Sequence, residues 1–149
     1  MRTKLAWLLG LVSAANGAFM LTLPVVWYPL IPGVLETGPF NAHFIRDIGA
    51  AFLVSGAALV WFANDSRARP AALAAAAFLT LHALVHVHDV LAARESLYHA
   101  ALDIPGVYLF AALACWIAWP QADLAKGGLH SDQMAVAPAD RRVRKGLLL

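Results

Sequence analysis

Long apolar stretches dominate the first 120 residues of the chain, and short polar segments separate them. Four stretches contain no Asp, Glu, Lys or Arg: residues 5–35, 48–64, 70–88 and 104–122. A helix needs roughly 20 residues to cross the hydrocarbon core of a bilayer, and each stretch is close to or above that length. The pattern predicts four membrane-spanning segments, at about residues 5–28, 40–63, 70–92 and 100–119.

Helices are the expected structure of these segments. Their runs of Ala, Leu and Val lack the alternation of barrel strands, and backbone groups in lipid must be satisfied within helices or closed barrels. The connections are short and carry Pro, Gly, Asn or Ser, so neighbouring helices should run antiparallel. We therefore expect an all-α fold, an antiparallel bundle of four transmembrane helices over residues 1–120.

Composition supports a membrane protein. Hydrophobic residues make up 61% of the chain and charged residues only 13%, whereas soluble domains carry about 25% charged residues. The bilayer is thus the principal partner. The first apolar run continues to Tyr28, which is too long for a typical cleavable signal sequence.

The basic residues predict the orientation, because short loops rich in Lys and Arg stay in the cytoplasm. Those that fall on one side of a four-span arrangement are Arg2, Lys4, Arg67, Arg69, Lys126, Arg141, Arg142, Arg144 and Lys145. Only Arg46 and Arg94 fall towards the other side. Both termini should face the cytoplasm, and residues 121–149 should form a basic, flexible cytoplasmic tail.

The first segment carries features that favour close helix packing. Gly10 and Gly17 are one heptad apart and should lie at a helix contact, where small residues let backbones approach. Asn16 should bond to a neighbouring helix. Pro24 should kink the helix near its outer end.

Histidines and carboxylates recur at one end of the predicted helices. In the third segment, His82, His86 and Asp89 fall within about 60° of arc on one face, whereas His88 points nearly opposite. Two imidazoles four residues apart, with a carboxylate three further on, can turn towards one point. That spacing is typical of helical sites for Zn or a first-row transition metal.

The second and fourth segments begin with a shared His-x-x-x-Asp pattern. His43 and Asp47 form the first pair, and His99 and Asp103 the second. Both pairs lie at the outward ends of their helices, level with the polar face of the third segment. Exposing such groups and Arg46 to lipid would be costly, so we expect them to point into the bundle.

These residues predict a metal site open to the outer face. The candidate ligands are His43, Asp47, His82, His86, Asp89 and Asp103, with Arg46 and His88 as further polar groups at the same level. Nitrogen and oxygen ligands favour Zn, Fe, Mn or Cu(II) over Cu(I), which prefers sulfur. Such a site could act on a small or lipid-borne substrate. The sequence leaves open whether the protein is an enzyme.

Two alternatives use the same residues. In the first, they form a clasp that fixes helix register. Arg46 would pair with Asp89 or Asp103, His43 would bond to Asp47, and His99 would cap or bond to Asp103. The protein would then be a non-catalytic subunit of a larger membrane complex. In the second, it is an electron-transfer subunit that binds haem. The haem ligands would then come from His43, His82, His86 and His99, with the two axial ligands on different helices.

Two short stretches carry a family resemblance: residues 37–49, with the sequence TGPFNAHFIRDIG, and residues 103–107, with DIPGV. With the order of spans, they resemble small four-span bacterial inner-membrane proteins of the DoxX-like group. The resemblance implies the same topology and a multi-pass location in the bacterial inner membrane. It implies no catalytic residues.

Other function classes lack their motifs. The chain has no Gly-rich phosphate loop, no G-x-S-x-G elbow and no dinucleotide fingerprint. Its single cysteine, Cys115, cannot form an internal disulfide. Nucleic-acid binding would depend on the short tail alone, so we expect none. Possible protein partners are further copies of the chain, in a homo-oligomer, or the subunits of a larger membrane complex.

Overall fold

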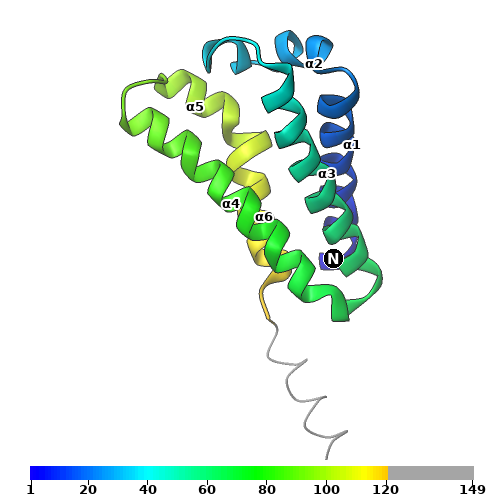
Figure 1. Cartoon of the computed structure of the whole chain (residues 1–149). Coiled ribbons are helices and arrows are strands. Elements are labelled where there is room, and N and C mark those ends of the chain that lie inside the picture. The colour runs from blue at the N-terminus through cyan, green and yellow to red at the C-terminus, as the bar shows by residue number, and fades with distance from the viewer. Residues whose placement is uncertain (121–149) are drawn as a thin grey trace, which may run out of the picture. The chain divides into compact units, whose positions relative to one another are not determined.

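The computed structural model describes residues 1–120 (Figure 1). Helices and turns account for the regular structure of this part of the chain, as predicted. The predicted basic tail, residues 121–149, lies outside the described residues. The elements, in chain order, are α1 (Arg2–Thr22), α2 (Pro24–Leu30), the 3-10 turn η1 (Val34–Glu36), α3 (Ala42–Asn64), the 3-10 turn η2 (Ser66–Ala68), α4 (Arg69–Leu91), α5 (Leu97–Asp103), the π-helical segment η3 (Ile104–Tyr108) and α6 (Leu109–Ala118).

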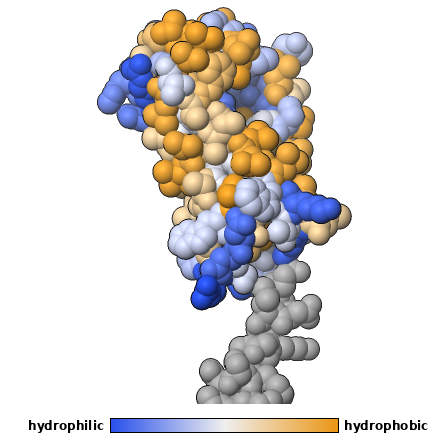
Figure 2. All heavy atoms as spheres, turned by 90° about the vertical axis from the view of Figure 1, so that its right-hand side faces the viewer, coloured by the Kyte–Doolittle hydropathy of each residue, from blue (hydrophilic) through white to orange (hydrophobic). Residues whose placement is uncertain are grey.

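Four helical stretches are long and apolar enough to cross a membrane, as the sequence predicted. They are Arg2–Thr22, Ala42–Asn64, Ser66–Leu91 and Leu97–Ala118. Large apolar side chains lie on their outer faces, and Val54 and Leu81 are 69% and 64% exposed. Figure 2 shows apolar residues over the middle of one face and hydrophilic residues towards its lower end. Such an apolar outer surface suits contact with lipid rather than water.

The two ends of this helical unit differ. Arg2 and Trp119 meet at one end, which we call the terminal end; the Arg2 guanidinium donates to the Trp119 carbonyl and lies 4.5 Å from the centre of the Trp116 ring. The opposite end, which we call the loop end, contains residues 31–41 and 92–96. Figure 1 shows α3 and α4 close together near the terminal end and diverging towards the loop end.

Helices α1 and α3 pack through glycines, as predicted for Gly10 and Gly17. A Cβ atom added at Gly17 would lie 2.4 Å from the Leu53 nitrogen. One added at Gly56 would lie 2.4 Å from the Gly10 carbonyl oxygen. Both positions therefore require glycine, because the neighbouring backbone occupies the space of a side chain.

Helices α3, α4 and α6 contribute to one hydrophobic core. Leu59 of α3, Leu79 of α4 and Ile117 of α6 are fully or almost fully buried there. Farther along, Thr80 Oγ1 of α4 lies 3.2 Å from Cys115 Sγ of α6. These contacts join α4 to α3 and to α6.

The first predicted span is interrupted rather than continuous. Residue Leu23 leaves helical geometry and Pro24 starts α2, because proline cannot donate the next backbone hydrogen bond. The Trp27 indole nitrogen donates to Asn16 Oδ1 across this break at 2.9 Å. Arg46 Nε of α3 donates to the Leu21 carbonyl at 3.2 Å. The predicted kink is thus a true break, stabilised by two hydrogen bonds from side chains.

The fourth span begins earlier than predicted and is not a regular helix. It starts at Leu97 rather than near residue 100, and η3 separates α5 from α6. The Leu109 amide donates to the Ile104 carbonyl, a bond over five residues. Pro105 explains this local widening, because it lacks an amide hydrogen. Such π-helical turns often occur at functional sites.

Candidate functional site: a histidine–carboxylate cluster at the loop end

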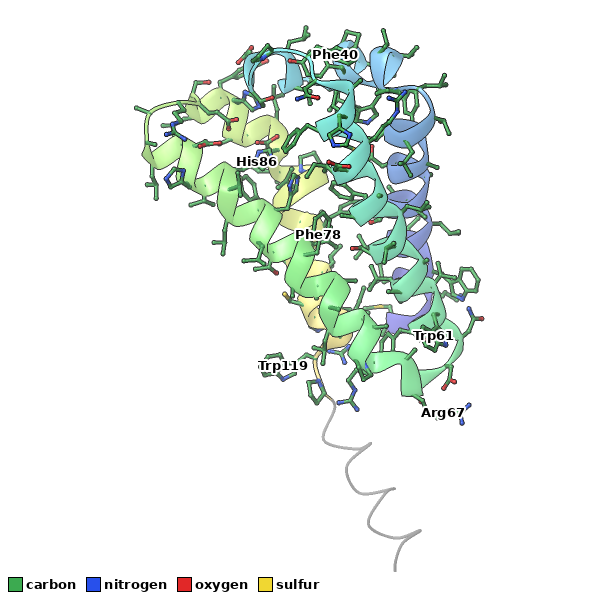
Figure 3. The ribbon with its side chains drawn as sticks, viewed as in Figure 1. Phe40, Trp61, Arg67, Phe78, His86 and Trp119 are labelled. Carbon is green, nitrogen blue, oxygen red and sulfur yellow. The ribbon has the colours of Figure 1, made fainter. Side chains whose placement is uncertain are left out.

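Three side chains from different segments meet near the loop end. His86 comes from α4, Glu95 from the turn after it, and Asp103 from the last position of α5. One potential ligand atom of each lies within 4.8 Å of the other two. We call these three residues the loop-end cluster. Figure 3 shows His86 on the inner side of α4, in the half of the bundle near the loops.

The contact between His86 and Asp103 is the tightest in the cluster. His86 Nδ1 lies 2.7 Å from Asp103 Oδ2, and their side chains are only 17% and 10% exposed. A bond of this length and burial fixes the orientation of the imidazole ring. It also joins α4 to α5 across the turn.

The turn between α4 and α5 brings the cluster together. Ala93 adopts a left-handed backbone conformation with φ of 55°. The amides of the next two residues donate to the Asp89 carbonyl, which closes the end of α4. Ser96 then caps the start of α5 by accepting from the His99 amide at 3.1 Å. The tight turn directs α5 back along α4, so that Asp103 lies beside His86.

Glu95 is placed unfavourably for a purely structural role. Its Oε2 atom is buried, and no group among residues 1–120 hydrogen-bonds to it. A carboxylate oxygen that is buried without a hydrogen-bond partner is costly. Two carboxyl groups beside one imidazole would be balanced by a cation, which would also satisfy this oxygen.

The donor set fits a transition metal. Ligand atoms at roughly 2.0–2.1 Å from one ion lie about 3 Å apart, so the three groups need only small side-chain adjustments to coordinate together. Alternatively, His86 Nδ1 donates to Asp103 and leaves Nε2 as the ligand, the arrangement in which a carboxylate orients a metal-binding histidine. Both arrangements leave at least one coordination position open.

His82 lies next to the loop-end cluster, one turn deeper along α4. Its ring centre is 4.9 Å from that of His86, with the two planes at 73°. Phe52 packs edge-on against the His82 ring at 5.3 Å, and Phe78 stacks on it at 6.1 Å. His82 thus lies between an aromatic wall and the cluster, and its nitrogen atoms are not among the close set of ligand atoms.

Asp89 does not join His86, although the sequence placed both on one face. Its Oδ1 atom lies 3.2 Å from His88 Nδ1 and 3.3 Å from an Arg94 nitrogen. The end of α4 turns at this position, and Arg94 competes for the carboxylate. Asp89 therefore stabilises the turn.

The predicted pairing of Arg46 with Asp89 or Asp103 is wrong. Arg46 instead bonds to the Leu21 carbonyl.

His43 and Asp47 form a separate pair on α3. His43 Nε2 lies 3.4 Å from Asp47 Oδ2, and the two side chains are 88% and 63% exposed. The contact itself agrees with the clasp interpretation, but both groups point outwards rather than into the bundle. Their exposure separates them from the partly buried loop-end cluster.

His99 anchors the loop before α3 to α5. Its side chain is 3% exposed, and its Nδ1 lies 3.3 Å from Glu36 Oε2 in η1. Gly33 packs directly on the ring, because a Cβ there would lie 2.3 Å from His99 Nε2. The predicted bond from His99 to Asp103 is thus replaced by one to Glu36.

The four candidate haem ligands have different environments. His82 and His86 lie on one helix side by side, His99 contacts Glu36, and His43 is exposed. Among residues 1–120, no contact of these four rings places two of them on opposite sides of an apolar space, as two axial haem ligands would be. Haem binding stays a prediction.

Sequence reasoning missed both glutamates. Glu95 sits in a short polar turn, where a solvated side chain is the ordinary expectation, and Glu36 lies in a loop. The short connection between the third and fourth segments could have indicated Glu95, because a residue in a short turn between antiparallel helices lies close to both helices. For Glu36, the residues of the sequence alone gave no indication.

Comparisons with known proteins add no assignment. Protein-family models, curated proteins and solved structures were compared with this chain, and none matches it.

Proposed function

We propose that this protein is a multi-pass membrane protein whose loop-end cluster binds a transition metal ion through His86, Glu95 and Asp103. The observation that carries this proposal is the buried, unpartnered Glu95 Oε2 beside the close His86–Asp103 pair. A bound cation would neutralise the two carboxylates and give that oxygen a partner. The proposal moves the centre of the predicted site away from His43, Asp47 and Asp89.

The ligand atoms limit the choice of metal. One imidazole nitrogen and carboxylate oxygens favour Zn, Fe, Mn or Cu(II). With three protein ligands, a four- or five-coordinate ion keeps a position for a substrate atom or water. When bound, such an ion supplies Lewis acidity to that ligand. The chain supplies the imidazole of His86, the carboxylates of Glu95 and Asp103, and the partial exclusion of water.

A structural clasp is the second candidate function. It is favoured by three further histidine–carboxylate contacts, His43–Asp47, His88–Asp89 and His99–Glu36, which have ordinary ion-pair geometry. In that case the protein would be an accessory subunit of a larger complex or a homo-oligomer. The clasp interpretation does not explain why Glu95 Oε2 is buried without a partner.

The wider setting of the proposal comes from the sequence. The distribution of basic residues supports cytoplasmic termini and an outward loop end. The DoxX-like resemblance supports a bacterial inner membrane. In this setting the metal site would face the extracytoplasmic side and could receive a small or lipid-borne substrate.

Metal content of the purified protein tests the proposal. The full chain would be purified in detergent, dialysed against each candidate metal and analysed by elemental mass spectrometry. We expect about one ion per chain in the native protein and in His43→Ala, the matched control, and a large loss in His86→Ala. Equal, negligible metal in all three proteins would overturn the metal site, and purification with a stoichiometric partner protein would then favour the clasp.

A further inference from the structure

We infer that the terminal end of the bundle binds the headgroups of anionic phospholipids, through basic side chains that lie among exposed tryptophans. This surface is at the opposite end from the loop-end cluster and does not depend on the proposed metal site. Three features carry it: the charge of the two ends, the exposure of the tryptophans, and the register in which α1 packs against α3.

The two ends of the bundle carry opposite charge. In the part of the chain that the structure describes, the terminal end has four cationic side chains and one carboxylate: Arg2, Lys4, Arg67, Arg69 and Asp65. Asp65 is already paired with Arg67 at 3.0 Å. Lys4 is exposed, and no carboxylate among residues 1–120 lies within ion-pair distance of it. Residues 31–47 and 86–103, towards the loop end, instead contain five carboxylates and two arginines.

Four of the five tryptophans of the chain lie towards the terminal end, and all four are exposed: Trp7, Trp61, Trp116 and Trp119. Figure 3 shows Trp61 and Trp119 at this end of the helices. The fifth tryptophan, Trp27, is buried in α2. Exposed indole rings near the ends of membrane helices lie at the level of the lipid headgroups. The cations of the terminal end therefore lie close to that level.

Lys4, Trp7 and Trp61 form a row on one side of the α1–α3 pair. The two helices are antiparallel, and Gly10 packs on Gly56. Trp61 follows Gly56 by five residues, which turns its side chain about 140° from the glycine contact. Lys4 precedes Gly10 by six residues and turns about 120° towards the same side. Trp7, one turn after Lys4, lies between them. The lysine stem can thus lie along indole rings while its ammonium group meets a headgroup.

Arg2 provides a second cation on a different face of α1. Its guanidinium donates to the Trp119 carbonyl at 3.4 Å and lies 4.5 Å from the centre of the Trp116 ring. These contacts hold the cation at the end of α6, beside two exposed indole rings. A positive charge held at this level attracts anionic headgroups.

A phospholipid fits this surface better than a soluble acidic partner. The helices that carry the tryptophans are long and apolar enough to cross a membrane. An indole ring has an apolar body and one polar N–H group, which suits the boundary between acyl chains and headgroups. The basic side chains select for net negative charge. Phosphatidylglycerol has a phosphate diester with that charge, whereas phosphatidylcholine has a phosphate diester balanced by its own cation.

Quenching of tryptophan emission by brominated lipids tests the proposal. The full chain would be placed in phosphatidylcholine nanodiscs with a fixed fraction of brominated phosphatidylglycerol or brominated phosphatidylcholine. Bromine quenches only nearby indoles, so the ratio of the two effects reports the headgroup preference at the terminal end. Lys4→Gln removes a charge there, and Lys4→Arg keeps it. Arg94→Gln is the matched control, because it removes an exposed charge near the loop end.

We expect the native protein and Lys4→Arg to prefer phosphatidylglycerol by at least about tenfold. Lys4→Gln should reduce this preference by about fivefold, and Arg94→Gln should leave it unchanged. A salt concentration of about 1 M should also reduce the preference of the native protein, and this measurement needs no variant. Soluble glycerophosphoglycerol, the headgroup without its chains, should not displace the lipid.

Each contrary result identifies the part of the proposal that fails. Equal quenching by the two brominated lipids in the native protein would overturn the binding of anionic lipid. A preference that Lys4→Gln retains, or that Arg94→Gln loses equally, would overturn the role of the terminal end. Displacement by glycerophosphoglycerol would show that the surface binds a free phosphate diester rather than a lipid. None of these results would bear on metal binding at the loop end.

Discussion

His86 Nδ1 and Asp103 Oδ2 lie 2.7 Å apart although their residues are 17 positions apart in the sequence. The bond crosses from α4 to α5 and is largely shielded from solvent. Three more histidines of the described chain also contact carboxylates, but their pairs are more exposed on at least one side. Of these four pairs, the interaction between His86 and Asp103 is therefore the least weakened by solvent screening.

A double-mutant cycle should measure that difference. The variants His86→Ala, Asp103→Ala and the double variant, unfolded in detergent without metal, should give a coupling free energy of about 1 kcal/mol, within the range of polar contacts between membrane helices. The matched cycle at His43 and Asp47 should give only a few tenths of that value, because the pair is exposed. Equal coupling in both cycles would contradict the assigned role of burial.

Glu95→Gln should separate stability from metal binding. The substitution removes a partly buried charge whose Oε2 atom has no hydrogen-bond partner among residues 1–120, so the metal-free variant should melt at the same temperature or higher. Metal affinity should fall by about tenfold or more, because an anionic ligand is lost. The two quantities are measured by thermal unfolding and by competition with a chelator. A lower melting temperature with unchanged metal affinity would instead show that Glu95 serves the fold.

The contact between Gly33 and His99 should be sensitive to one added carbon. Gly33→Ala places a methyl group in the His99 ring and forces a left-handed conformation with φ of 86°. We expect a loss of about 2 kcal/mol, measured by thermal unfolding. Gly38→Ala is the control, because its φ is also positive but no atom lies within 4 Å of the added carbon. A loss of equal size in both variants would assign the effect to backbone strain alone.

Asp65 at the terminal end should make a small contribution to stability that depends on pH. The side chain and amide of Arg67 hydrogen-bond to its carboxylate and hold the pKa of Asp65 below its usual 3.8. A lowered pKa in the folded state means that the stabilisation is complete above about pH 4 and disappears as the pH falls through the folded pKa.

Asp65→Asn should accordingly lower the melting temperature at pH 6, and the difference from the native protein should shrink as the solution becomes more acidic than pH 4. Arg67→Gln should give the same trend. A difference that stays constant down to strongly acidic solution would contradict a stabilising role of the ionised Asp65 carboxylate.

The sequence predicted the membrane helices because hydrophobic length is a strong and local signal. It also located Pro24 and the glycines of α1. It missed the full break at Leu23 and the π-helical segment after Asp103, since both depend on how freed backbone groups find new partners. The sequence shows that a proline lacks an amide hydrogen. Whether the helix then kinks, breaks or widens depends on the neighbouring helices.

The candidate site was predictable in part for a similar reason. Helical periodicity correctly placed His82 and His86 on one face, and Asp103 at the level of His86. Periodicity could not show that α3 turns His43 and Asp47 outwards, or that Arg94 binds Asp89. Nor could it show that the short turn presses Glu95 into the cluster. Those outcomes depend on helix rotation and turn geometry, which are set by packing.

X-ray absorption spectroscopy of the metal-loaded full chain tests the central claim most directly. The proposed site predicts a first shell of nitrogen and oxygen at roughly 2.0–2.2 Å, with the outer-shell signal of one imidazole. That signal should disappear in His86→Ala and persist in His43→Ala. A shell of oxygen atoms without an imidazole signal, identical in the native protein and His86→Ala, would contradict metal binding by the loop-end cluster.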